Sequence, residues 1–127
     1  DDLVPPTPGV MLASSPGIWR FDDFLSQAQV QHVLSRAPAS DEEWHPCGGS
    51  CHEHILLKEC AHAPVGDDPV LRSILTKIEI TWGADVDKVA SLPLVRYRPG
   101  AAATLPHHDV YAGSGSIPDA SMLFYLS

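Results

Sequence analysis

The spacing of apolar residues changes at Gly83 from a helical to a strand-like period. The segment before it, GDDPVLRSILTKIEITWG, has Asp67 or Asp68 at a capping position, Pro69 in the first turn and apolar residues at helical spacing, and so predicts a helix. After it, apolar patterns predict three strands, at LPLVRYR (92–98), LPHHDVY (105–111) and SMLFYLS (121–127). Helices followed by antiparallel strands predict an α+β domain with helices packed on a sheet.

The first half of the chain contains one further helical pattern. In FDDFLSQAQVQHVLSRAP the apolar residues approximate one stripe, with Asp22 or Asp23 as the expected cap and Pro38 as the residue that ends the helix. Residues 39–54 are polar and contain Gly, Cys and His, so they predict a loop. The apolar run in HILLKEC (54–60) predicts a short strand, with a buried helical turn as the alternative.

Length and charge limit what the chain can be. Its 127 residues suffice for one domain, residues 18–127, preceded by a proline-rich extended arm, residues 1–17. The net charge of −8, with only eight Lys and Arg in total, argues against binding to nucleic acid, which needs clustered basic residues. No apolar run approaches the roughly 18 to 20 residues that cross a bilayer, so we expect no transmembrane segment.

The segment YRPGAAATLPHHDVYAG carries a possible metal-binding pattern. Successive side chains of a strand alternate faces, so His107 and Asp109 are expected to point the same way and His108 the opposite way. An imidazole and a carboxylate in this arrangement are two of the three ligands of the two-His-one-carboxylate triad that suits non-haem Fe(II). The alternative is a solvated loop whose polar residues satisfy turn backbone groups.

A second cluster of metal-ligand types lies in HPCGGSCHEHILLKECAH. The chain has three cysteines, Cys47, Cys51 and Cys60. Because the number is odd, at least one thiol stays unpaired within this chain. A small zinc module, a local disulfide between Cys47 and Cys51, and a loop without ligands all remain open. The spacing of Cys60 and His62 is tighter than zinc sites usually have.

Four segments in order resemble the prolyl 4-hydroxylase-like group of 2-oxoglutarate and Fe(II)-dependent dioxygenases. IWRFDDFLSQAQVQHVL resembles the opening strand and helix of these domains, and DDPVLRSILTKIEITWG resembles the long helix before the core sheet. LPLVRYRPGAAATLPHHDVY is similar to the family pattern of Tyr, two residues, Gly and then His-x-Asp, and SMLFYLS to the next core strand. The resemblance spans residues 17–127.

The resemblance implies a fold, a reaction and a set of site residues. The fold would be a double-stranded β-helix (jelly roll) with N-terminal helices packed on the sheet. His107 and Asp109 would be the first two iron ligands, and Tyr97 and Tyr125 would face the 2-oxoglutarate. The cofactors would be Fe(II), 2-oxoglutarate and ascorbate, and the substrate a peptidyl proline or a related small molecule. For both tyrosines, a role as core filler is the alternative.

The sequence departs from the family pattern in ways that bear on activity. The stretch between Gly100 and His107 is Ala-rich where the family has an aromatic residue, and the His comes one residue later than the commonest spacing. The family's second His and the basic residue that pairs with 2-oxoglutarate lie on later strands. We therefore expect an incomplete jelly roll that does not catalyse by itself, whose strand 121–127 is covered by a missing C-terminal half or a protein partner.

A second hypothesis follows from the same departures. The chain would then be a non-catalytic, dioxygenase-derived accessory subunit that docks into a larger protein assembly through its arm and its open sheet edge. The sequence leaves the compartment open, with the secretory pathway or an organelle lumen favoured over the cytoplasm.

Overall fold

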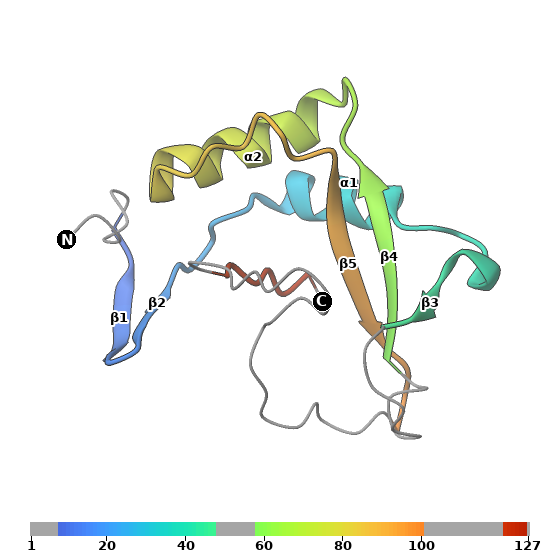
Figure 1. Ribbon diagram of the computed structural model, residues 1–127, viewed down its shortest axis with the longest axis horizontal. Coiled ribbons are helices and arrows are strands. Elements are labelled where there is room, and N and C mark those ends of the chain that lie inside the picture. Colours follow the sequence, from blue (N-terminus) through green and yellow to red (C-terminus); the bar gives the residue numbers. More distant parts are fainter. Residues whose placement is uncertain (1–7, 48–57, 101–120, 127) are drawn as a thin grey trace. The chain divides into compact units, whose positions relative to one another are not determined.

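Helices and antiparallel sheets are both present, which confirms the α+β class (Figure 1). The computed structural model describes the residues in three ranges, 8–47, 58–100 and 121–126. Within these ranges, none of the helices is long and apolar enough to cross a membrane.

The chain divides into two compact units. The first comprises Asp1–Ala37 and Ala63–Leu92, and the second comprises Pro38–His62 and Pro93–Ser127. The chain passes from one unit to the other after Ala37, and again within two strands, β4 (Lys58–Pro64) and β5 (Ser91–Tyr97).

The first unit opens with a β-hairpin, which occupies part of the expected proline-rich arm. Strand β1 (Val10–Ser14) pairs antiparallel with β2 (Gly17–Arg20), with Val10 opposite Arg20 and an irregularity between Met11 and Ala13. The arm was expected because proline removes backbone donors, but its prolines flank β1, so the strand itself keeps its donors.

Helix α1 (Gln27–Arg36) begins later than expected. Its cap is Ser26 and not Asp22 or Asp23, because Ser26 forms a capping box in which its Oγ accepts from the Gln29 backbone N–H and the Gln29 side chain accepts from the Ser26 N–H. Asp23 instead has a positive φ of 54°, a turn conformation. The helix ends at Arg36, shortly before Pro38, as expected.

Helix α2 (Pro69–Trp82) confirms the predicted second helix. Asp68 caps it by accepting hydrogen bonds from the Val70 and Leu71 N–H groups, Pro69 occupies the first turn, and Gly83 ends it in the left-handed conformation. The predicted stripe is the buried face, and Leu71 is completely buried, which stabilises the unit by about 2 kcal/mol.

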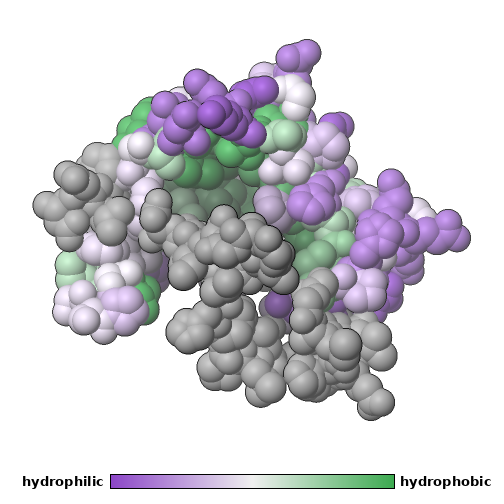
Figure 2. All heavy atoms as spheres, viewed as in Figure 1, coloured by the Kyte–Doolittle hydropathy of each residue, from purple (hydrophilic) through white to green (hydrophobic). Residues whose placement is uncertain are grey.

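The core of the first unit is formed by α1, α2 and the segments that precede and follow α2. Its buried apolar residues come from α1, the end of β4 and the α2–β5 region: Val33, Ala63, Val65, Leu71, Ile74, Leu75 and Val86. Figure 2 shows polar residues on the outer side of α2 and apolar residues beneath them. The helices are also joined by hydrogen bonds, including one of 2.9 Å from Lys77 Nζ to Gln29 Oε1.

The second sheet has the strand order β3–β4–β5. Strand β3 (His45–Pro46) pairs antiparallel with β4, with His45 opposite Cys60. The prediction of a continuous loop over residues 39–54 is therefore wrong in its described part, which holds a 3-10 turn, Asp41–Glu43, as well as β3. The turn forms because the Ser40 side chain caps it, and β3 forms because β4 supplies its hydrogen-bonding partner.

Strand β4 continues beyond the end expected at Cys60, to Pro64. Ala61 and Ala63 are buried while His62 and Pro64 are exposed, which is the alternation of a strand. The sequence pattern did not reveal it because the buried residues are alanines and not large apolar residues. Strand β5 confirms the prediction for residues 92–98, one residue earlier at each end.

Two expected strands remain. The one at 105–111 lies outside the described residues. Residues 121–126 are not part of a sheet, although exposure alternates along them, because a strand needs a neighbour to bond with as well as an apolar pattern. Leu123 and Tyr125 are 77% and 88% exposed.

Candidate functional site

Strand β5 leads directly into the predicted metal-binding motif. It ends at Tyr97, and Gly100 follows with a positive φ of 85°, a backbone conformation that favours glycine. His107 and Asp109, the predicted iron ligands, lie outside the described residues. Within the described ranges, no three His, Cys, Asp or Glu side chains form a group that could hold a metal ion.

The two predicted cosubstrate residues are both exposed. The Tyr97 side chain lies on β5, with the Lys58 ammonium 5.8 Å from its ring centroid, and it is 56% exposed. Tyr125 is more exposed still. Neither tyrosine is buried, and their role toward 2-oxoglutarate stays a prediction.

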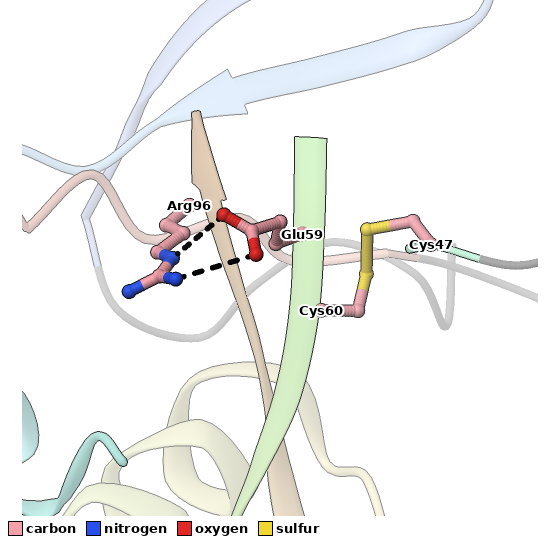
Figure 3. Close-up of a disulfide and its surroundings, with 4 residues drawn as sticks. All are labelled: Cys47, Glu59, Cys60 and Arg96. Carbon is pink, nitrogen blue, oxygen red and sulfur yellow. Dashed lines mark hydrogen bonds and ion pairs between the residues drawn. A yellow bond between two sulfur atoms is a disulfide. The ribbon is translucent and has the colours of Figure 1, made fainter. Parts of the chain in front are cut away.

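An ion network lies beside Tyr97 in the second unit. The Glu59 carboxylate, from β4, accepts hydrogen bonds from Arg96 Nε at 3.1 Å and Arg96 Nη2 at 3.3 Å (Figure 3). It accepts a further one from Arg98 Nε. Asp41 accepts from Arg96 Nη2 at 2.9 Å and lies 3.3 Å from Arg98. Arg96, in β5, and Arg98, just after its end, thus share two carboxylates.

Arg96 also packs on an aromatic ring. Its guanidinium carbon lies 4.4 Å from the ring centroid of Trp44, a stacked cation–π arrangement. Trp44 is 9% exposed, and its indole N–H donates to the Pro38 carbonyl at 3.1 Å. The guanidinium is therefore held by the ring on one side and by carboxylates at its edge.

The network changes the ionisation of its carboxylates. Hydrogen bonds from Arg96, and then from Arg98, lower the pKa of Glu59, against an opposing effect of burial. The same two arginines lower the pKa of Asp41. The Glu59 side chain is 13% exposed and that of Asp41 is 70% exposed, so solvent screens Glu59 less.

A disulfide joins Cys47 to Cys60, with their Cα atoms 5.0 Å apart. The Cys47–Cys51 bridge that the sequence left open as one alternative does not form, because pairing of β3 with β4 brings the chain at Cys47 beside Cys60. The bonded sulfurs cannot serve as thiolate ligands for zinc. Cys51, the third cysteine, lies outside the described residues.

A separate pocket of about 270 Å³ lies in the first unit. Its lining includes Phe21, Phe24, Lys77 and Ile80, from the β2–α1 connection and α2. It contains none of the residues predicted from the sequence as ligands or cosubstrate contacts.

Sequence reasoning missed Glu59, Trp44 and the pairing of Arg96 with both carboxylates. Alternation within LPLVRYR does place Arg96 and Arg98 on the face opposite Tyr97. It does not say which strand lies alongside, so the acidic partner could not be chosen from the sequence.

No protein-family model, curated protein or solved structure matches this chain.

Proposed function

We propose that the chain is part of a prolyl 4-hydroxylase-like dioxygenase that depends on Fe(II) and 2-oxoglutarate, with a double-stranded β-helix as its complete fold. The observation that carries the proposal is the order of elements around β5: helix α2, then a strand ending at Tyr97, then the Gly100 turn, then His107-x-Asp109. The same order underlies the resemblance of the sequence to that family.

The residue types fit the proposed metal. Imidazole and carboxylate are ligands that Fe(II) accepts, and a His-x-Asp pair would supply one of each from a single strand. His107 and Asp109 would hold the iron. The third ligand, a histidine, and the basic residue for the far carboxylate of 2-oxoglutarate are assigned to no residue of this sequence.

The bound iron and 2-oxoglutarate together supply the activation of oxygen needed to hydroxylate a C–H bond of a peptidyl proline or a related substrate. The chain's own residues would bind and orient the iron and the 2-oxoglutarate. The exposed Tyr97 hydroxyl would donate a hydrogen bond to a carboxylate of 2-oxoglutarate, and Tyr125 would line the same pocket. Ascorbate, as in the family, would keep the iron reduced.

The disulfide supports a secretory or lumenal location, because bonds of this kind persist in oxidising compartments. Peptidyl proline in secreted proteins is a substrate class that such a compartment would offer.

The proposal is tested by anaerobic binding of Fe(II) and 2-oxoglutarate to the full-length natural protein, followed by hydroxylation of a proline-rich peptide. Asp109→Ala is expected to lose iron binding. Asp87→Ala, which removes an exposed carboxylate between α2 and β5, is the matched control and is expected to keep it. Equal iron binding by both variants would reject Asp109 as a ligand.

The second candidate is the accessory subunit. It is favoured by the exposed apolar side chains of residues 121–126, with Leu123 77% exposed. Under this function the full-length protein would bind neither Fe(II) nor 2-oxoglutarate and would co-purify in a stoichiometric assembly. Substituting Leu123 by Asp would then release it from that assembly.

A further inference from the structure

We propose that Glu59 is a positioning residue: its carboxylate anchors Arg96 and Arg98 and so fixes the direction in which Tyr97 presents its hydroxyl to 2-oxoglutarate. The inference rests on the proposed function, since it names a residue that acts on the cosubstrate through Tyr97. It concerns a residue outside the ligand set that the family resemblance implies.

Strand geometry carries the first step. Arg96 and Tyr97 are the last two residues of β5 and point to opposite faces of it, and Arg98 is the first residue after the strand. Both arginines are bound to the same carboxylate, so the backbone on either side of Tyr97 is tied to one point of β4. A rotation of the strand that re-aimed Tyr97 would have to break these contacts.

The anchor itself is held in place. Cys60, the residue after Glu59, is bonded to Cys47, so β4 is fixed to β3 on its other side (Figure 3). Trp44 supports the Arg96 guanidinium at 4.4 Å. Lys58, the residue before Glu59, lies over the Tyr97 ring. β4 thus contacts both faces of the end of β5.

Glu59, and not Asp41, is the centre of the network. It accepts two hydrogen bonds from the Arg96 fork and one from Arg98, and it is shielded from solvent, whereas the Asp41 side chain is mostly exposed. Without the Glu59 charge, Arg96 and Arg98 would repel each other with only an exposed carboxylate between them. The side-chain contacts that tie the end of β5 to β4 would then be lost.

The experiment compares Glu59→Gln with Asp68→Asn in the full-length natural protein. Asp68 is a matched control because its side chain is 11% exposed, it is an ion-paired carboxylate, and it caps α2 in the first unit. The measurements are anaerobic calorimetry of Fe(II) and of 2-oxoglutarate, thermal unfolding, and hydrogen exchange of the backbone amides of β5.

We expect Glu59→Gln to weaken 2-oxoglutarate binding about tenfold, as loss of an orienting partner does, with Fe(II) binding unchanged. Exchange at the amides of residues 96–98 is expected to be faster. Asp68→Asn is expected to lower the melting temperature. Its 2-oxoglutarate binding and its amide exchange at residues 96–98 are expected to stay at the wild-type value. A purely structural role for Glu59 would instead make the two variants lose 2-oxoglutarate binding in proportion to their loss of stability, which would overturn the proposal.

The exchange measurement separates this proposal from the proposed function. Unchanged exchange at residues 96–98 in Glu59→Gln rejects the anchor whatever the protein binds. If exchange is faster but the wild-type protein does not bind 2-oxoglutarate, the anchor stands as a structural feature, while the proposed function and the role of Glu59 toward the cosubstrate are both rejected.

Discussion

Glu59 and Cys60 are consecutive residues of β4 whose side chains reach different neighbouring strands. Glu59 binds Arg96 of β5 at 3.1 Å, and Cys60 is bonded to Cys47, next to β3 (Figure 3). Because β4 lies between β3 and β5 in the sheet, with a partner on each side, one dipeptide links three segments of the second unit. The strand that leads to the predicted metal motif is thereby held at its end.

Loss of the disulfide is expected to destabilise the protein. Cys47 and Cys60 are 13 residues apart, and a loop of that length gives a stabilisation of about 3 kcal/mol when it is closed. Urea unfolding of Cys60→Ser, compared with wild type, measures this loss. Cys51→Ser removes a thiol that is not in the bridge and is the control; equal destabilisation by both would contradict the assignment of the pair.

Acid is expected to weaken the network around Glu59. Its pKa is lowered by Arg96 and Arg98, so its contribution to stability is complete above the ordinary value of 4.5 and is lost as pH falls through the lowered value. Asp41 and Asp68, whose pKa values are also lowered, add to this acid dependence. Unfolding by urea between neutral pH and about pH 3 should therefore show a smaller loss of stability in Glu59→Gln than in wild type. An identical loss in both would contradict the ion pairing of Glu59.

Asp68 is expected to matter more for stability than its partner His32. The His32 Nε2 atom lies 2.7 Å from Asp68 Oδ2, which joins the helices, but Asp68 also accepts from two N–H groups at the start of α2. Thermal unfolding should show a larger decrease in melting temperature for Asp68→Ala than for His32→Ala. The reverse order would mean that the cap contributes less than the contact between helices.

The sequence predicted elements well where local signals agreed. For α2, the cap, the proline, the apolar stripe and the final glycine all indicate one helix, and the structure confirms its bounds. For α1, the predicted caps, Asp22 and Asp23, lie a few residues before Ser26, and only Ser26 has Gln29 at the position that completes a capping box. Choosing the cap by acidic residue type alone therefore placed the start of α1 too early.

Features that depend on pairing between distant segments could not be predicted. The Cys47–Cys60 bond requires β3 to lie against β4, and the Glu59–Arg96 pair requires β4 to lie against β5. The cysteine spacing left a Cys47–Cys51 bridge open and did not point to Cys60, and a short strand such as His45–Pro46 has too few residues to show a period. The predicted ligands His107 and Asp109 stay a prediction.

The most direct measurement is iron-dependent conversion of 2-oxoglutarate to succinate by the full-length natural protein and by two neighbouring variants, His107→Ala and His108→Ala. If residues 105–111 form the predicted strand, side-chain alternation would put the two imidazoles on opposite faces, so only His107 would share a face with Asp109. The account predicts turnover by wild type and by His108→Ala, and none by His107→Ala. Turnover by His107→Ala at the wild-type rate, or a wild-type protein that forms no succinate, would contradict it.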